Sequence, residues 1–291
     1  MAKLSKVTSP KTILCVMAHP DDESFGMGGT LALYAALGHK VHLLTATKGE
    51  AGEVEEQFLQ KYNSIAELRT DELCCAARIL NLASVEFLDY RDSGMAGSQD
   101  NNHLESLFQT PVEEVAGHIL TAIRKLKPDV VLTFDPIGGY RHPDHIAVHN
   151  ATVLAFEQSA DPTVPDSENL PPHQPARLYF HTMPVAFMRF AIKLMKLIGK
   201  DPRRFGKNQD IDLVSIAEVN FPIHVRINYS SVQRQRDAAS ACHASQGGGK
   251  MGGGILGPLR RIMAKPVDNF MQAYPLGEDG RVRTDLFDGL S

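Results

Sequence analysis

The stretch TILCVMAHPDDE at residues 12–23 decides the fold, because an apolar run suited to a buried strand ends in a cluster of polar residues. A second stretch repeats this order, since the apolar residues 130–134 are soon followed by HPDH at 142–145. Open α/β sheets bind their ligands at the carboxyl ends of parallel strands. We therefore expect both polar clusters to lie at one edge of a sheet and to form a single site.

The first 160 residues alternate strand-like and helix-like patterns. This alternation predicts an α/β fold with a Rossmann-like, mostly parallel sheet and helices on both faces. The predicted strands are 12–18, 41–47, 85–90 and 129–135. The predicted helices are about 27–38, 64–82, 111–127 and 144–159.

The pattern after residue 160 is less regular. Residues 161–176 are rich in Pro, Asp and Ser, which is typical of a surface loop. Residues 247–258 contain seven glycines and predict a mobile loop at the mouth of the pocket. Further strands are predicted near 177–182 and 223–228, and helices near 184–198 and 230–244. We expect one domain over 1–291, with the Rossmann-like core at 1–160 and an irregular substrate-capping part at 161–291.

The composition is that of an ordinary globular protein, with 43% apolar and 22% charged residues in a chain of 291. A net charge of −4 gives no electrostatic reason to expect nucleic acid as a partner. The four cysteines (Cys15, Cys74, Cys75 and Cys242) show no C-x-x-C spacing, so we expect them to be reduced. The apolar run 13–18 is too short for a signal peptide. These features favour a cytoplasmic protein.

Three residues of the two clusters predict a zinc site. His19 and Asp22 are three residues apart on a turn that Pro20 stiffens, so an imidazole and a carboxylate can face one point. His145 would add a third ligand from the second cluster. Two nitrogens and one oxygen leave an open position on Zn²⁺ for water, whose pKa then falls to about 7.

The residues beside these ligands are suited to acid–base chemistry. Asp21 could take the proton of the water as a general base. His142 lies three residues before His145 at a predicted helix start, and could stabilise an oxyanion or protonate a leaving amine. Asp144 could orient the His142 imidazole as a hydrogen-bond partner.

Other interpretations of these residues stay open at this stage. A rival ligand pair is His145 with His149, one turn apart on a helix, although it lacks the glutamate of the zincin pattern. The glycines at 26–29 do not form G-x-G-x-x-G, which disfavours a dinucleotide site. No G-x-S-x-G elbow is present, which disfavours a serine nucleophile.

The run AHPDDE at 18–23, with GGT at 28–30, resembles the PIG-L/LmbE family of zinc-dependent N-deacetylases. The resemblance continues in family order through four later motifs. These are ELRTDEL at 67–73, YRDSGM at 90–95, GYRHPDH at 139–145 and HASQ at 243–246. The RDSGM stretch is most similar to the branch that contains the mycothiol-biosynthesis deacetylase and the mycothiol S-conjugate amidase.

The resemblance implies roles at the matching positions. The zinc ligands would be His19, Asp22 and His145, with Fe²⁺ able to replace zinc in cells. The catalytic residues would be Asp21 as base, His142 with Asp144 as acid and stabiliser, and Tyr140 at the oxyanion. The residues holding hydroxyls of a glucosamine ring would be Arg69 and Asp92. Alternatively, Arg69 is a solvated ion-pair residue, Asp92 shapes a turn and Tyr140 is a surface aromatic.

The expected function is hydrolytic removal of the N-acetyl group from an N-acetylglucosaminyl small molecule. Alternatives are an amidase that cleaves a mycothiol-type thiol conjugate, and a sugar-binding protein with a vestigial site, which the intact residue set argues against. The basic amphipathic stretch 184–207 raises a membrane-surface role, which we do not expect because a helix packed on its own domain has the same pattern. The sequence leaves the aglycone, the native metal and the oligomeric state open, and it is compatible with a homo-oligomer.

Overall fold

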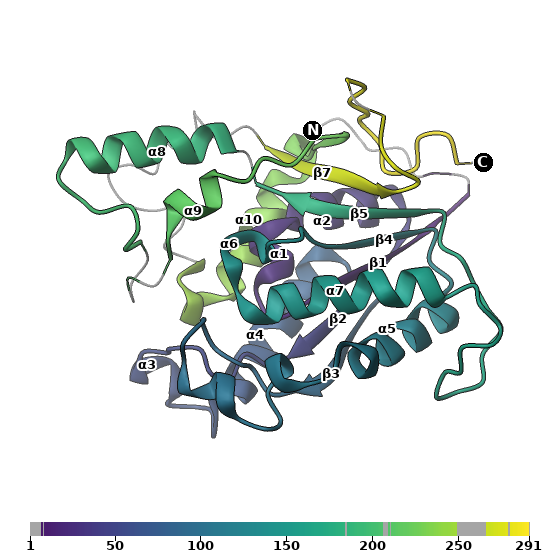
Figure 1. Ribbon diagram of the computed structural model, residues 1–291, viewed down its shortest axis with the longest axis horizontal. Helices are drawn as coiled ribbons and strands as arrows, with labels where there is room; N and C mark the ends of the chain where they lie inside the picture. The colour runs from purple at the N-terminus through teal and green to yellow at the C-terminus, as the bar shows by residue number, and fades with distance from the viewer. Residues whose placement is uncertain are drawn as a thin grey trace.

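A seven-stranded sheet forms the centre of the molecule in the computed structural model (Figure 1). The structure describes residue 7 and residues 9–183, 185–205, 209, 211–248, 266–278 and 280–290, with the backbone alone at 186 and 187. The strands lie in the order β3-β2-β1-β4-β5-β7-β6. Their bounds are β1 Thr12–Met17, β2 Lys40–Thr47, β3 Ser84–Tyr90, β4 Val130–Phe134, β5 Arg177–Thr182, β6 Val225–Asn228 and β7 Val267–Tyr274.

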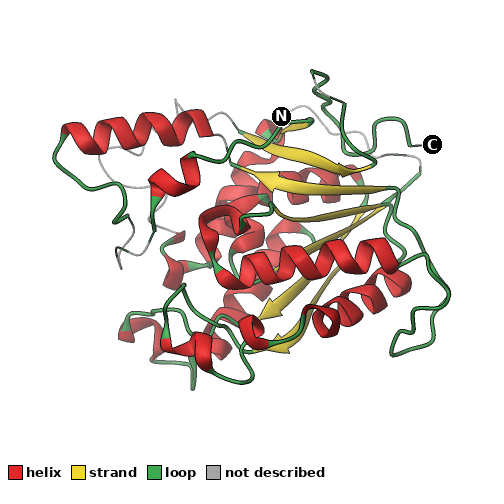
Figure 2. Ribbon diagram, viewed as in Figure 1, coloured by secondary structure: helices red, strands yellow, loops and turns green. Residues whose placement is uncertain are grey.

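The strands from β3 to β5 are all parallel, and β7 runs antiparallel to both β5 and β6. The predicted Rossmann-like, mostly parallel sheet is therefore confirmed. The carboxyl ends of the parallel strands lie at the left in Figure 2. The beginning of β7 lies at the same edge, because Asn269 pairs with Thr182 at the end of β5.

Five long helices cover the two faces of the sheet (Figure 1). On one face α5 packs against α7, and on the other α10 packs against α4 and α2. Their bounds are α2 Gly28–Leu37, α4 Ile65–Leu80, α5 Val112–Leu126, α7 Pro143–Gln158 and α10 Gln233–Cys242. Shorter elements at the carboxyl edge are α1 Asp22–Gly26, α3 Glu56–Leu59, α6 Gly138–Arg141, η1 Gln99–Asn102, η2 Leu107–Gln109, η3 Ser230–Val232 and η4 Ala244–Gln246.

Helix boundaries follow from local chemistry. The Ser64 side chain accepts from the Glu67 N–H at the start of α4, and Asn81 ends that helix in the left-handed conformation. At the start of α7, His142 is the N-cap and Pro143 occupies the first turn, where its missing N–H costs nothing. The second polar cluster is therefore a helix start at the carboxyl edge of the sheet, as the sequence predicts.

Helix α8 (Val185–Leu197) projects from the body beside α9 (Leu213–Ala217) and presents three stripes (Figure 1). The stripe of Met188, Ile192 and Met195 is buried or half-buried. The stripe of Phe190, Leu194, Leu197 and Ile198 is 48–83% exposed. The stripe of Arg189, Lys193, Lys196 and Lys200 is also exposed. The expected packing of this helix on its own domain thus holds for one apolar stripe and not for the other.

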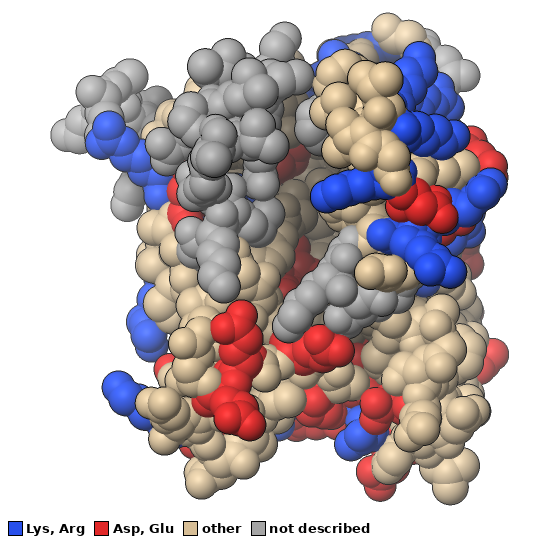
Figure 3. All heavy atoms as spheres, turned by 90° about the vertical axis from the view of Figure 1, so that its left-hand side faces the viewer, with Lys and Arg blue, Asp and Glu red and all other residues tan. Residues whose placement is uncertain are grey.

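The charged side chains are unevenly distributed on the face of the molecule that lies at the left in Figure 1 (Figure 3). Lys and Arg gather mainly at the upper right of this view, and Asp and Glu mainly in its lower half. Glu53 and Glu55, shortly before α3, and Glu56, its first residue, are exposed. No helix among the described residues is long and apolar enough to span a membrane.

One expectation is wrong, one strand was missed and one expectation lies outside the described residues. Cys75 of α4 and Cys242 of α10 form a disulfide, although all four cysteines were expected to be reduced. The pair is 167 residues apart in the sequence, so no local spacing could reveal it. Strand β7 was not predicted. Only Gly247 and Gly248 of the glycine-rich segment 247–258 are described, so the predicted loop mobility has no structural test.

Candidate metal centre

His19, Asp22 and His145 converge at the carboxyl edge of the sheet, between the ends of β1 and β4. The His145 Nε2 atom lies 3.2 Å from His19 Nδ1 and 3.3 Å from Asp22 Oδ1. The second carboxylate oxygen of Asp22 lies 3.4 Å from His19 Nδ1. The two imidazoles are at most 5% exposed. The structure thus brings together the three residues predicted as metal ligands.

Each of these contacts is close to the spacing of tetrahedral ligands, with Oδ1 of Asp22 facing His145 and Oδ2 facing His19. Metal–ligand bonds of about 2.0–2.1 Å place tetrahedral ligand atoms about 3.3–3.4 Å apart. Two other groupings at this site also bring one ligand atom from each residue within 4.8 Å of one another. They are His19 with His142 and His145, and His19 with Asp92 and Asp144.

The ligand atoms are oriented by hydrogen bonds on their far sides. The Nδ1 of His145 pairs with the Gly138 carbonyl at 3.2 Å, which leaves its Nε2 for a metal. The backbone N–H of His19 donates to Asp22 Oδ2 at 2.8 Å and closes the turn that carries both ligands. An added Cβ at Gly138 would lie 2.8 Å from the His145 Cβ, so glycine is needed for this close approach.

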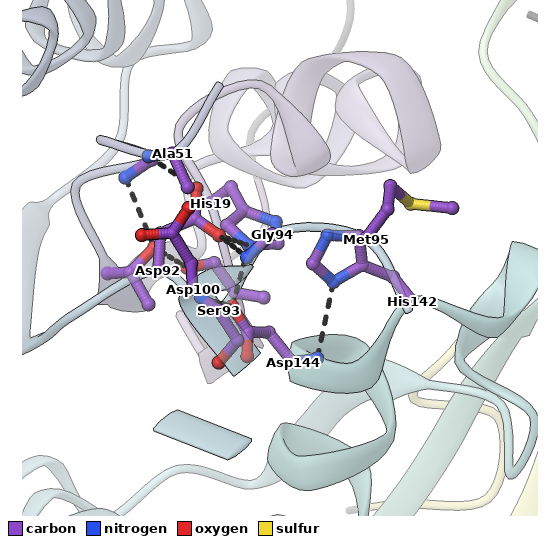
Figure 4. A network of polar contacts seen from close by, with 12 residues as sticks. His19, Ala51, Asp92, Ser93, Gly94, Met95, Asp100, His142 and Asp144 are labelled. Carbon is purple, nitrogen blue, oxygen red and sulfur yellow. Dashed lines mark hydrogen bonds and ion pairs between the residues drawn. The ribbon is translucent and has the colours of Figure 1, made fainter. Parts of the chain in front are cut away.

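The second nitrogen of His19 faces carboxylates, as Figure 4 shows. Its Nε2 lies 3.2 Å from Asp144 Oδ2 and 3.5 Å from Asp92 Oδ1. Asp144 also accepts the Ser93 N–H at 2.9 Å. Because the carboxylate of Asp144 pairs with the His19 imidazole, the expected pairing of this carboxylate with His142 is not found. A carboxylate behind a ligating imidazole fixes its tautomer and increases its basicity.

His142 contacts Asp144 through the backbone instead. Its Nδ1 accepts the Asp144 N–H at 3.2 Å as the N-cap of α7. Burial, together with the neighbouring His19 and His145 imidazoles, lowers the pKa of His142 to about 2. A neutral His142 whose Nδ1 is an acceptor carries its proton on Nε2, from which it can donate a hydrogen bond.

The negative charge of the site exceeds its positive charge. Burial alone would lower the pKa of His19, but the carboxylates of Asp92, Asp144 and Asp22 raise it well above its usual value. Burial opposes ionisation of Asp22, yet His145 and His19 hold its pKa well below the usual range. A divalent cation would balance such a cluster of buried carboxylates.

Asp21 occupies a strained backbone position next to the ligands. Its φ is 120°, which non-glycine residues rarely adopt, and such strain is typical of functional sites. Its carboxylate lies 3.2 Å from the Arg69 guanidinium. Burial raises the pKa of Asp21 to about 6, against the opposing effect of Arg69. The side chain lines the cavity beside the ligands and can accept a proton there.

The Arg69 guanidinium is held by backbone carbonyl groups. Its guanidinium donates to the carbonyls of Gly49 at 2.9 Å and Pro20 at 2.6 Å, and the residue is 4% exposed. A Cβ at Gly49 would lie 2.1 Å from the guanidinium, so the loop accommodates Arg69 only with glycine there. Arg69 is thus not a solvated surface residue, and it supports the turn that carries Asp21.

Asp92 is also held by backbone groups. It accepts the N–H of Gly94 at 2.8 Å and of Ala51 at 3.3 Å, as Figure 4 shows. It therefore shapes the turn after β3, and its contact with His19 places it at the metal centre as well.

Tyr140 follows two glycines with positive φ, Gly138 and Gly139. The carboxylate of Asp135 holds this turn by accepting the Gly139 N–H at 2.9 Å. The Tyr140 ring meets His145 edge-on at 4.9 Å, and the residue lines the cavity rather than the outer surface. Burial raises the pKa of Tyr140, so its hydroxyl remains a hydrogen-bond donor.

Sequence reasoning missed one buried pair that supports the site. The His243 Nε2 lies 2.8 Å from Glu23 Oε1, and neither side chain is exposed to solvent. Glu23 also accepts the Asp21 N–H at 3.0 Å. The link from α10 therefore holds the strained turn. The only sequence signal was the HASQ motif, since 220 residues separate the two partners.

The rival ligand His149 pairs instead with the Phe134 carbonyl at 2.9 Å.

A cavity of about 380 Å³ begins at the ligands Asp22 and His145 and extends toward β5 and β7. Phe25, Met27 and Phe134 form part of its apolar wall. Neither Arg69 nor Asp92 lines it.

Comparison with known families finds the PIG-L family, described as GlcNAc-PI de-N-acetylase, over residues 14–156. A 1D-myo-inositol 2-acetamido-2-deoxy-alpha-D-glucopyranoside deacetylase from Streptomyces avermitilis is 35% identical over 298 residues, covering 97% of this chain and 98% of its own. A protein of the same name from Thermobifida fusca is 35% identical over 246 residues, covering 81% and 83%.

Solved structures share the fold at lower identity. An N,N'-diacetylchitobiose deacetylase from Pyrococcus horikoshii matches with a TM-score of 0.61 at 20% identity, covering 90% of this chain and 83% of its own. A 4-carboxy-2-hydroxymuconate hydratase from Pseudomonas putida matches with a TM-score of 0.58 at 18% identity, covering 92% and 98%. Because a deacetylase and a hydratase share this fold, the reaction has to be argued from the side chains.

Proposed function

Because this chain belongs to the PIG-L (GlcNAc-PI de-N-acetylase) family, we propose that it is a hydrolase that removes the N-acetyl group from an N-acetylglucosaminyl small molecule. The observation that carries the proposal is the spacing of 3.2–3.4 Å among the ligand atoms of His19, Asp22 and His145. The aglycone we propose is an inositol, because the two relatives named above, each 35% identical to this chain, are named for that substrate.

We propose zinc as the ion at this site, held by His19, Asp22 and His145. Two imidazoles and one carboxylate are the ligand types of catalytic zinc sites, and they also suit ferrous iron. When bound there, zinc supplies Lewis acidity and lowers the pKa of a water molecule to about 7.

The side chains around the ligands divide the proton transfers between them. Asp21, in the cavity wall beside the ligands, takes the proton of the attacking water and holds it for the leaving amine. Arg69 fixes the position of this carboxylate at 3.2 Å. The Tyr140 hydroxyl and the Nε2 proton of His142 are donors for the negative charge that develops on the amide oxygen.

The sugar is proposed to bind on the side of Arg69 and Asp92. Both residues lie on the β2–β3 side of the ligands, and Asp92 shares the His19 imidazole with Asp144. Ring hydroxyls would share Asp92 with the N–H groups of Gly94 and Ala51. We also propose that residues 1–291 act as one domain, since strands from both parts of the chain form one sheet.

The test is the release of acetate and free amine from a panel of N-acetylglucosaminides, including the inositol conjugate, by the zinc-loaded protein. The proposal predicts stoichiometric release of both products and its loss in His145→Ala. A matched control is His118→Ala, which changes a histidine of α5 outside the metal centre. Absence of turnover on every N-acetylated sugar would contradict the proposal.

A further inference from the structure

We propose that the cavity between the metal ligands and β7 is an acyl-side subsite, which accepts N-acyl groups larger than acetyl that end in an anionic group. The inference rests on the proposed amide hydrolysis and names the substrate class more closely. Four features carry it: the side of the ligands on which the cavity lies, its size, the open polar groups of its wall and an arginine at its border.

The strand order indicates where the amine side and the acyl side of the substrate amide would lie relative to the metal ligands. Asp92 follows β3 and Arg69 lies on α4, whereas the cavity wall comes from β5, β7 and α10. The metal ligands lie between these two sides, at the ends of β1 and β4. With the amide carbonyl at the metal and the amine on the side of Asp92, the acyl carbon chain points into the cavity.

The cavity is larger than an acetyl group requires. An acetyl group places one methyl beyond the carbonyl carbon, and a water-sized group occupies about 30 Å³. The volume of about 380 Å³ therefore leaves room for several additional heavy atoms. Close packing is the rule in protein interiors, so space of this size next to reacting groups points to a ligand.

The distal wall presents polar groups without partners in the chain. Asn269 at the start of β7 is 7% exposed, and within the described part of the chain no hydrogen bond to its side-chain amide is found. The imidazole of His181 on β5 and the hydroxyl of Tyr229, both half-buried, also have no hydrogen-bond partner among these residues. A buried polar group normally has a partner, so the Asn269 amide in particular is available to a ligand. The Tyr229 ring lies against Gly29, where a Cβ would be 2.2 Å from it.

Arg236 of α10 gives the cavity a positive end. Among the described residues its guanidinium makes two long contacts, at 3.3 Å to the half-exposed Asp237 and 3.4 Å to the Phe25 carbonyl. Four acids also line the cavity. Asp21, Asp22 and Asp135 belong to the turns at the candidate metal centre, and Asp268 of β7 accepts both the N–H and the hydroxyl of Thr30. The Arg236 guanidinium, with the N–H and O–H donors of the distal wall, suits a carboxylate at the end of the acyl chain.

The test compares kcat/KM for three glucosaminides that differ in the acyl group only. N-succinyl carries a terminal carboxylate, N-(4-methylpentanoyl) has the same number of heavy atoms without charge, and N-acetyl is the reference. The inference predicts that N-succinyl is cleaved at least about tenfold better than N-(4-methylpentanoyl), since a charged hydrogen bond is worth about tenfold or more. It also predicts cleavage of N-succinyl at least as efficient as that of N-acetyl.

Variants of the wall identify the residues responsible. In Arg236→Met and in Asn269→Leu, the ratio of kcat/KM for N-succinyl to that for N-acetyl should fall about tenfold or more. Arg234→Met is the matched control, because Arg234 is exposed on the same helix and does not line the cavity. Circular dichroism and the Tm of each variant verify the fold.

The outcomes separate this inference from the proposed function. Cleavage of N-acetyl without cleavage of the longer substrates overturns the inference and leaves the deacetylase proposal intact. An unchanged ratio in Arg236→Met also overturns it. If no N-acyl glucosaminide is cleaved, both the inference and the proposed function are wrong.

Discussion

At the scale of single residues, Asp21 combines backbone strain with a chemical role. Its φ of 120° is maintained by the Glu23 carboxylate on its N–H and by Arg69 on its side chain. Strain of this kind costs of order 1–3 kcal/mol and persists only where the surroundings enforce it. The resulting position places the carboxylate in the cavity wall beside Asp22 and His145.

Asp21→Asn should therefore separate catalysis from metal binding. The amide has nearly the same size and cannot accept a proton, so we expect kcat to fall by about 10²–10⁴. Zinc should remain stoichiometric by atomic emission spectrometry. A variant that loses its zinc would show that Asp21 is a ligand and that the division of roles is wrong.

Asp144→Asn tests whether the Asp144 carboxylate supports His19 as a zinc ligand, and it does not test the hydrolysis itself. The carboxylate of Asp144 lies 3.2 Å from the second nitrogen of His19. Removal of such a partner typically weakens metal affinity about 10–100-fold. Competition with a chromogenic chelator measures this affinity. Asp237→Asn, at a half-exposed position on α10, serves as the control and should not alter it. Equal zinc affinity in wild type and Asp144→Asn would argue against the role.

Asp268 gives a pH dependence of stability with a defined sign. Burial raises its pKa from 3.8 to about 6, against the opposing hydrogen bonds from Thr30. Between these two pH values the unfolded chain releases the proton while the folded protein retains it, so stability falls as the pH rises. Two pKa units correspond to about 3 kcal/mol. Asp268→Asn should lack this loss, so its stability relative to wild type should increase from pH 4 to 6.

Urea unfolding of both proteins at pH 4, 5, 6 and 7 measures this difference. Contributions of other titrating groups cancel in the comparison, since the two proteins differ at one position. A relative stability that does not vary with pH would contradict the raised pKa of Asp268.

At the scale of elements, the sequence predicts the structure where apolar runs are long. The strands β1, β2 and β4 are recognisable from their largely apolar residues, and their boundaries differ from the prediction by one residue. Strand β7 was missed because VDNFMQAY mixes polar and apolar residues. Two of its polar groups find distant partners in the folded protein, since Asp268 accepts from Thr30 and the Gln272 N–H donates to His224.

The predicted surface loop at 161–176 has a buried anchor that the sequence does not reveal. The Arg124 guanidinium donates to the carbonyls of Ser159, Val164 and Asp161, and it pairs with Asp166 at 2.8 Å. Arg124→Met should lower the Tm by about 5 °C or more, because it leaves these buried groups unpaired.

Lys125→Met is the matched control for this anchor. Lys125 pairs with Glu168 in the same loop, but both side chains are about half exposed. Its loss should change the Tm by about 1 °C or less. Differential scanning calorimetry compares the two variants. Equal effects would show that Arg124 does not anchor the loop.

At the scale of the whole molecule, the site depends on segments that are distant in the sequence. The convergence of His19, Asp22 and His145 was predictable, because His19 and Asp22 come directly after a strand and His145 lies at the start of α7. The partners of His19 and Glu23 were not predictable, since Asp144 and His243 are 125 and 220 residues away from them. Sequence patterns reveal which strands end in polar residues, whereas side-chain pairing across the sheet edge requires the fold.

The position of the bound ion tests the account most directly, because His19 offers a nitrogen to each of two neighbouring carboxylate clusters. Anomalous diffraction at the zinc edge from crystals of the zinc-loaded protein locates the ion. The account predicts one peak about 2.0–2.2 Å from His19 Nδ1, an Asp22 oxygen and His145 Nε2. A peak coordinated instead by His19 Nε2, Asp92 and Asp144 would contradict it.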